Sequence, residues 1–150
     1  MAFDVHVRER ILQPVGRVFE AVMDPEQMSH YFISKGSGRL EAGKDITWEF
    51  ADVGTRVKLH VLEVVKDKRI VYESKALGDL IRTTINFEAE GPDATVITIT
   101  DSSFPMTDEG VKRALGQNAG WTYTLCGLKA YLQFGINLRK GLNKRITDTG

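Results

Sequence analysis

The 150-residue chain has one cysteine, Cys126, and no excess of charge of either sign, with 20 Lys plus Arg against 20 Asp plus Glu. A single cysteine excludes an internal disulfide and favours a reducing compartment. The charged, alternating N-terminus is unlike a secretion signal, and no run approaches the apolar length of a transmembrane helix. Balanced charge gives no basis for binding nucleic acid or a membrane. We therefore expect a single cytoplasmic domain covering residues 1–150.

One stretch carries a partial phosphate-binding pattern. GSGRLEAGKD, residues 36–45, matches all but the last position of a P-loop. A P-loop needs a helix after it, and a Ser or Thr after the lysine to bind magnesium. Here Asp45 follows Lys44, and the next residues alternate between apolar and polar as a strand does. We therefore predict a hairpin turn in which Gly43 allows the tight bend.

Hydropathy alternates with a period of two through most of the chain, which predicts strands. The predicted strands are 3–11, 46–52, 56–65, 69–74, 81–90 and 95–101. The strand at 56–65 slips phase towards Leu62 and Val64, which predicts a bulge. Two short helices, 14–24 and 25–32, follow the first strand, because apolar residues recur there at helical spacing. Short strands joined by short turns predict an antiparallel sheet.

A long amphipathic helix is predicted near the C-terminus. Its apolar stripe consists of Trp121, Leu125, Leu128, Leu132 and Ile136, and is widened by Tyr131 and Phe134. We expect the helix to begin between Thr107 and Asn118, with Asn118 a candidate cap, and to fray near Gly141. The Ser-rich segment 101–105 is predicted to be a loop before this helix, with a polar rim for a ligand as the alternative.

These segments come in an order that resembles a known family. The residues that carry the resemblance are the helical run ending in Asp24-Pro25-Glu26, the strand Arg69-Ile70-Val71-Tyr72, and Gly120-Trp121 with Leu125 and Leu128-Lys129. Together they resemble the activator-of-Hsp90-ATPase homologue family, within the START and birch-pollen-allergen helix-grip superfamily, over about Val5 to Phe134. The resemblance implies an α+β helix-grip fold. In that fold a curved antiparallel sheet of about six or seven strands wraps around a long C-terminal helix, with two short helices after the first strand.

The resemblance also implies an apolar cavity between the sheet and the helix, and with it a small, largely hydrophobic or lipid ligand. The expected lining residues are Met28, Phe32, Trp48, Phe50, Tyr72, Phe104, Trp121 and Leu125. Plain core packing is the alternative for each of them. Two positions depart from the family pattern, Tyr31 where many relatives carry Trp and Asp101 where many carry His or another polar group. Both are expected near the cavity mouth.

Two other classes of function stay open. The family name implies a chaperone-associated interaction domain with an Hsp90-type partner and a role in stress response, which predicts a filled cavity and an exposed docking face. A polyketide cyclase or aromatase-like enzyme would need acid–base groups inside the cavity. The candidates for those groups are Asp101, Tyr72, His30 and Arg82. A monomer and a homodimer are both compatible with the sequence.

The remaining reactive side chains give weaker signals. The histidines lie in separate predicted elements, so no metal site and no cofactor is predicted. His6 and His60 fall on the polar phase of their strands and should face outward, whereas His30 is close enough to reach a cavity mouth. Arg82 is expected to face solvent, although an inward Arg82 would anchor a carboxylate. Cys126 is expected to pack, buried or half-buried, as a small hydrophobic side chain.

Overall fold

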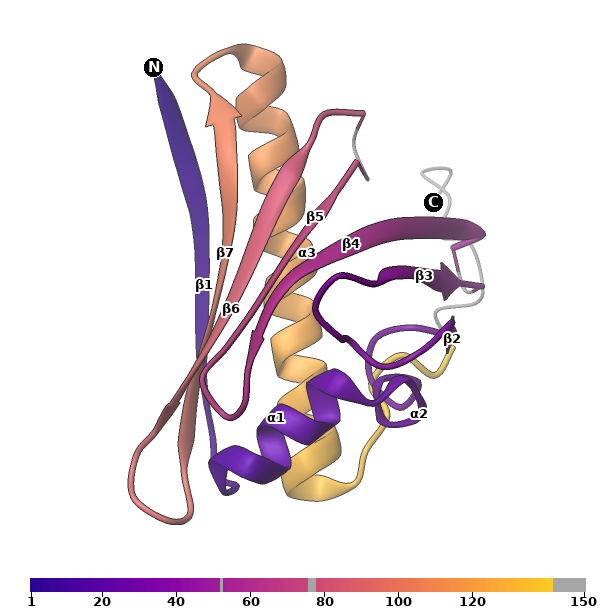
Figure 1. Cartoon of the computed structure of the whole chain (residues 1–150), viewed down its shortest axis with the longest axis vertical. Helices are drawn as coiled ribbons and strands as arrows, with labels where there is room; N and C mark the ends of the chain where they lie inside the picture. The colour runs from indigo at the N-terminus through magenta and orange to yellow at the C-terminus, as the bar shows by residue number, and fades with distance from the viewer. Residues whose placement is uncertain (52, 76–77, 142–150) are drawn as a thin grey trace.

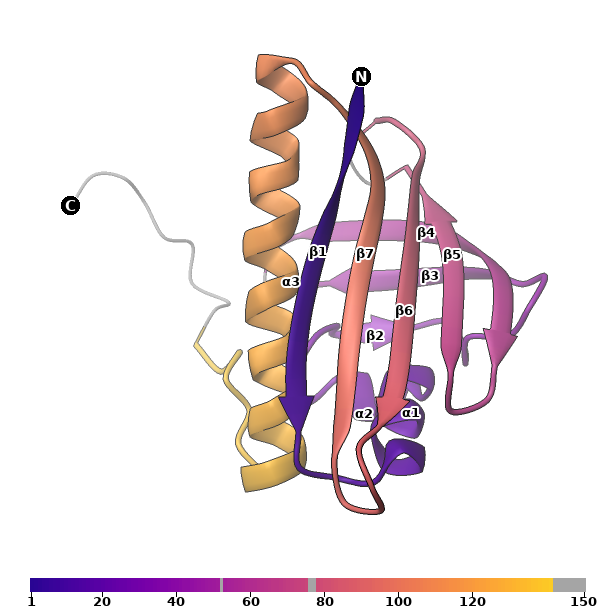
Figure 2. The same cartoon turned by 90° about the vertical axis from the view of Figure 1, so that its left-hand side faces the viewer.

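The computed structural model describes residues 1–51, 53–75 and 78–141. A seven-stranded antiparallel sheet, in the order β1-β7-β6-β5-β4-β3-β2, curves around one long helix (Figures 1 and 2). Along the chain the elements are β1 (Ala2–Ile11), α1 (Val15–Met23), α2 (Pro25–Met28), β2 (Lys35–Gly36), β3 (Asp45–Phe50), β4 (Thr55–Val65), β5 (Arg69–Ser74), β6 (Ile81–Ala89), β7 (Thr95–Pro105) and α3 (Asp108–Phe134). The predicted α+β class is confirmed. No helix in these described segments is long and apolar enough to cross a membrane.

Helix α3 is defined by its two ends. Thr107 caps the first turn, where its side-chain oxygen accepts a hydrogen bond from the Gly110 backbone N–H over 3.1 Å. At the other end Gly135 takes a left-handed conformation with φ +67°, which glycine adopts without a Cβ penalty. The predicted cap at Asn118 is therefore wrong, because Asn118 lies inside the helix. The predicted end near Gly141 is also wrong, since the helix stops at Phe134.

The predicted stripe on α3 is confirmed for its first four members. Trp121, Leu125, Leu128 and Leu132 are buried. Ile136 was assigned wrongly: it follows the turn at Gly135 and is 52% exposed. Burying the four residues contributes at most about 6–12 kcal/mol, since the unfolded chain already hides part of this surface.

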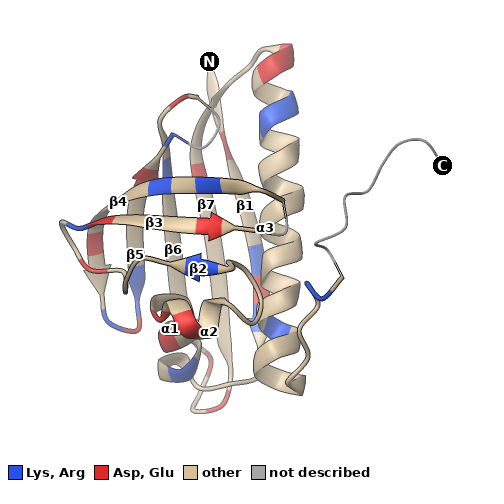
Figure 3. Ribbon diagram, turned by 90° about the vertical axis from the view of Figure 1, so that its right-hand side faces the viewer, with Lys and Arg blue, Asp and Glu red and all other residues tan. Residues whose placement is uncertain are grey.

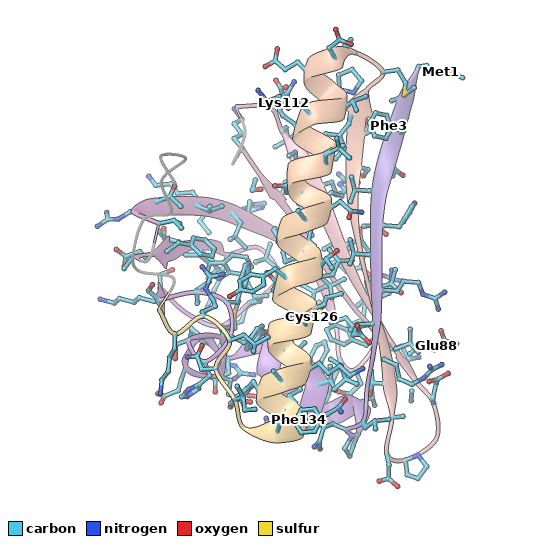
Figure 4. All side chains as sticks on the ribbon, turned by 180° about the vertical axis from the view of Figure 1, so that it is seen from behind. Met1, Phe3, Glu88, Lys112, Cys126 and Phe134 are labelled. Atoms are coloured by element: carbon cyan, nitrogen blue, oxygen red, sulfur yellow. The ribbon has the colours of Figure 1, made fainter. Side chains whose placement is uncertain are left out.

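Cys126 is exposed, contrary to expectation. Each helix residue is rotated by about 100° from the one before it, so the residue after the inward Leu125 points away from the sheet. Figure 4 shows Cys126 on the outer face of α3.

Strand β7 continues through residues 101–105, where a loop was predicted. Its neighbours provide backbone partners on both sides, because Ser102 pairs with Arg82 of β6 and Phe104 pairs with Phe3 of β1. Tertiary pairing thus overrides the local turn preference of the two serines. The predicted bulge in β4 is confirmed by a register shift between Val61 and Glu63.

The segment that resembles a P-loop is a turn, as predicted. Gly43 has φ +85°, and its N–H donates to the Val61 carbonyl over 2.8 Å. Strand β3 then starts at Asp45, so no helix follows Lys44.

Charged side chains of both signs lie on the neighbouring strands β2, β3 and β4 (Figure 3). Arg56 of β4, for example, pairs with Glu49 of β3 at 3.1 Å.

Candidate functional site: a cavity between the sheet and α3

A cavity of about 220 Å³ lies between the sheet and the middle of α3. Its side chains come from the segment after α2, from strands β3 to β6, from α3 and from the segment that follows α3. The volume is about half as large again as the ~150 Å³ cavity that accepts benzene. It therefore suits a ligand of roughly two fused rings.

One wall of the cavity is aromatic. Phe32 stands edge-on to Trp48 and Phe50, with ring centroids 5.3 and 5.2 Å away. It also lies 5.4 Å from Trp121 of α3. Trp48 in turn makes an edge contact with Tyr72 at 5.4 Å. These separations are typical of favourable aromatic pairs, so the wall is firm and apolar.

The predicted ligand residues fall into three groups. Phe32, Trp48, Phe50, Tyr72 and Trp121 line the main cavity. Met28 and Leu125 line a second space of about 20 Å³, which shares Phe32, Trp48 and Trp121 with the first. Phe104 lines neither and packs instead against Phe3, with ring centroids 6.0 Å apart. Contact of these residues with a ligand stays a prediction.

A buried polar cluster stands behind the cavity. Asp101 is fully buried, and its Oδ1 accepts a hydrogen bond from the Thr83 hydroxyl over 2.6 Å. Its Oδ2 accepts from Gln117 Nε2 and from Trp121 Nε1, each over 2.8 Å. Buried carboxylates are tolerated when donors satisfy them in this way.

The two positions that depart from the family pattern are not at the mouth, contrary to expectation. Asp101 lies behind the lining, because β7 continues past it and holds it towards α3. Tyr31 is buried and donates its hydroxyl to the Ala21 carbonyl over 2.9 Å. Neither residue lines the main cavity.

Tyr72 is the most strongly perturbed group on the cavity wall. Burial raises the pKa of Tyr72 far above its ordinary value, and the nearby Asp101 carboxylate raises it further. The polar side chain of Thr83, which pairs with Tyr72 across β5 and β6, lowers the pKa of Tyr72 and offsets part of this rise. Tyr72 therefore stays a neutral phenol at neutral pH.

The rim of the cavity includes Arg139, a position that the sequence did not predict. Arg139 lies beyond α3, yet its guanidinium sits 6.0 Å from the Phe50 ring and 5.8 Å from the Tyr123 ring. The Tyr123 hydroxyl donates to the Leu138 carbonyl over 2.9 Å, which holds the returning segment against α3. This approach depends on the turn at Gly135, and no periodicity in the sequence signals it.

The acid–base candidates do not converge on the cavity. His30 is exposed and stacks on Tyr131 with ring centroids 5.1 Å apart. Arg82 faces solvent, as predicted, and lies 3.7 Å from Glu73. His6 and His60 also face outward, as predicted. Of the four candidates only Tyr72 lines the cavity, with Asp101 behind it.

Comparison with known proteins identifies the family to which the chain belongs. The chain matches the family described as Activator of Hsp90 ATPase homolog 1-like protein over residues 13–133. It belongs to this family. The resemblance drawn from the sequence is thereby confirmed. Among curated proteins, no sequence matches this member of the Activator of Hsp90 ATPase homolog 1-like family.

Solved structures share the fold of this family member. A Staphylococcus saprophyticus protein is 33% identical, with a TM-score of 0.81 over 91% of this chain and 96% of its own. DynU16, from the dynemicin biosynthetic locus, is 24% identical, with a TM-score of 0.79 over 89% of this chain and 48% of its own. The Aha1 dimer from Colwellia psychrerythraea is 18% identical, with a TM-score of 0.75 over 88% of this chain and 97% of its own. The last two likenesses show the fold alone.

Proposed function

We propose that this protein binds a small, largely hydrophobic ligand in the cavity between the sheet and α3. The observation that supports the proposal most is an aromatic wall beside about 220 Å³ that side chains leave unfilled. Protein interiors are otherwise close-packed, and concave apolar sites with a few polar groups are the usual form of small-molecule sites. Phe32, Trp48 and Trp121 would exclude water from the ligand, and Tyr72 would orient it.

The size of the cavity sets the expected affinity. A ligand of two fused rings that buries about 250 Å² of apolar surface gains roughly 6 kcal/mol at about 25 cal/mol per Å². Losses of translational and rotational freedom reduce that gain. We therefore expect dissociation constants from tens of micromolar to about a millimolar for simple aromatic probes.

Native and denaturing mass spectra of one purified preparation test the proposal. We expect a mass increment that disappears on denaturation, or, for an empty protein, saturable binding of naphthalene. Gly120→Leu should abolish either signal, because Gly120 lines the cavity and has open space around it. Gly116→Leu is the matched control, since it lies one helical turn away, is equally unobstructed and does not line the cavity. A bare mass together with no naphthalene binding would refute the proposal.

A chaperone-associated interaction domain is the second candidate, favoured by the family match over residues 13–133. It predicts that the protein stimulates the ATPase of an Hsp90-type chaperone and that Gly120→Leu leaves the stimulation unchanged.

The Colwellia relative was solved as a dimer. We therefore also expect a homodimer in solution, which light scattering after gel filtration would detect. A cyclase-like reaction is the third candidate, and of the four acid–base groups predicted for it only Tyr72 lines the cavity.

A further inference from the structure

The wall of the cavity carries a single charge, and that charge is positive. Of the described residues that line the cavity, only Arg139 is charged, and the others are apolar or carry neutral hydroxyl and amide groups. Arg139 is half-buried, so water surrounds its guanidinium less completely than it surrounds an arginine on an open surface. Guanidinium groups at partly buried sites recognise planar oxyanions, because their N–H groups match a carboxylate in geometry and charge.

Several contacts hold Arg139 in place at the rim. Its backbone N–H donates to Asn137 Oδ1 over 2.9 Å, and the next carbonyl towards α3, that of Leu138, accepts from the Tyr123 hydroxyl over the same distance. The Phe50 and Tyr123 rings attract the guanidinium by cation–π contact, which does not use its N–H groups as hydrogen-bond donors. A guanidinium has five such N–H groups, so it can give two to a carboxylate while the others keep further contacts.

The end of the cavity beside β5 and β6 is unsuited to a charged ligand group. Thr83 and Gln117 line this end, and both donate to the buried Asp101 carboxylate. Ser74 and Tyr72 add two hydroxyls, which can donate or accept hydrogen bonds but carry no charge. Asp101 is close enough to Tyr72 to raise the pKa of its phenol. A ligand anion among these groups would therefore be repelled by Asp101, strongly so where water is scarce.

Aromatic rings separate this end of the cavity from Arg139. The contacts run from Arg139 to Phe50, from Phe50 to Phe32, and from Phe32 to Trp121. The Trp121 indole N–H then donates to Asp101. A ligand with one anionic end thus has one favourable orientation, with its charge beside Arg139 and its apolar part along the rings.

We propose that the ligand is an aromatic monocarboxylate, bound with its carboxylate at Arg139 and its rings inside the cavity. This inference rests on the proposed function and adds to it the charge and the orientation of the ligand. The single lining cation matches the one negative charge of a carboxylate, whereas a phosphate monoester carries nearly two. Tyr72 and Ser74 then meet only neutral parts of the ligand.

Four probes of one ring system separate charge from shape: naphthalene, 2-naphthoate, 2-naphthamide and 2-(aminomethyl)naphthalene, a cation at pH 7. Chemical-shift changes in the NMR spectrum of the protein measure their affinities. The amide has nearly the shape of the carboxylate but no charge. We expect 2-naphthoate to bind about five- to tenfold more tightly than 2-naphthamide at low salt, a factor between that of an exposed ion pair and that of a buried charged hydrogen bond. The cation should bind more weakly than the amide.

Salt and a second anion sharpen the comparison. Raising the ionic strength from about 0.01 M to about 1 M should lower the preference for 2-naphthoate at least twofold, because salt screens a half-buried ion pair in part. The ester 2-naphthyl phosphate should bind no more tightly than 2-naphthoate.

Paired variants locate the effect. In Arg139→Gln, 2-naphthoate and 2-naphthamide should bind within about twofold of each other, because the charge is gone and an amide donor remains. Lys140→Gln is the matched control, since it removes the same charge from the next residue, which is exposed and does not line the cavity. It should keep the preference within about twofold of the wild-type value. Arg139→Lys should keep part of the preference, because it retains the charge without the two-pronged geometry.

The outcomes separate this inference from the proposed function. Binding of naphthalene with equal affinities for 2-naphthoate and 2-naphthamide in the wild-type protein would overturn the inference and leave the proposed function standing. A preference for 2-naphthoate that persists in Arg139→Gln, or tighter binding of the cation or of 2-naphthyl phosphate, would overturn it too. Failure of every probe, naphthalene included, would refute the proposed function and the inference with it.

Discussion

The Trp121 indole nitrogen lies 2.8 Å from Asp101 Oδ2, and this hydrogen bond joins the middle of α3 to β7. Trp121 therefore has two roles, since its ring lines the cavity and its N–H satisfies a buried carboxylate. Trp48 on the facing wall is buried to a similar degree, but its N–H has no partner among the described residues. The two tryptophans thus differ in whether the indole N–H is satisfied.

That difference predicts unequal costs for the same substitution. Trp121→Phe should lower the free energy of unfolding by about 1.5–3 kcal/mol more than Trp48→Phe does, because it removes a hydrogen bond to a charged group. Both variants lose comparable apolar area, so Trp48→Phe serves as the control. Urea denaturation followed by far-ultraviolet circular dichroism measures both. Equal losses would contradict the hydrogen bond assigned to Trp121.

Two glycines of α3 predict opposite effects of adding a methyl group. A Cβ at Gly110 would collide with the Pro105 carbonyl oxygen and lie 2.9 Å from Pro105 Cγ, so Gly110→Ala should destabilise by about 2 kcal/mol or more. Gly116 has nothing within 4 Å, and Gly116→Ala should stabilise by about 0.5–1 kcal/mol through helix propensity. Thermal unfolding of the two variants tests the start of α3. A stable Gly110→Ala protein would mean that the chain enters the helix differently.

The buried tyrosines predict a loss of stability in alkali. Burial raises the pKa of Tyr31 and of Tyr72 above the ordinary value, so the folded state holds both phenol protons more tightly. Their contribution is complete below about pH 10, where the unfolded chain also keeps these protons, and is lost as the pH rises above that value. Each tyrosine should contribute a slope of about 1.4 kcal/mol per pH unit.

The matching measurement is the free energy of unfolding between pH 9 and pH 11. Tyr72→Phe and Tyr31→Phe should each remove about one tyrosine's share of the slope, and the double variant should remove both. An unchanged slope in either single variant would show that its phenol is not held neutral by the fold.

The sequence predicted the fold better than it predicted the cavity between the sheet and α3. Most of the sheet could be predicted from alternating hydropathy, as in 46–52 and 95–101. The buried face of α3 could be predicted from the apolar stripe between Trp121 and Leu132. Both predictions work because burial repeats with the period of each element. The end of α3 was missed, since apolar residues continue to Ile136 although Gly135 turns the chain. The hydropathy pattern does not show that the helix ends there.

The polar cluster was missed for a different reason. Thr83, Asp101 and Gln117 are far apart in sequence and meet only after the sheet and α3 have packed. One signal was available, because Asp101 continues the inward phase of Ile97 and Ile99 along β7. A carboxylate on the buried side of a strand needs hydrogen-bond donors. The sequence therefore predicts that Asp101 has such donors, but it does not say which residues they are.

Asp101 does not line the cavity, yet the three side chains that donate to it, Thr83, Gln117 and Trp121, all do. The orientation of three lining side chains is therefore held by a residue outside the lining. A comparison of relatives by their lining residues alone would miss a substitution at Asp101, although that substitution would release all three side chains at once.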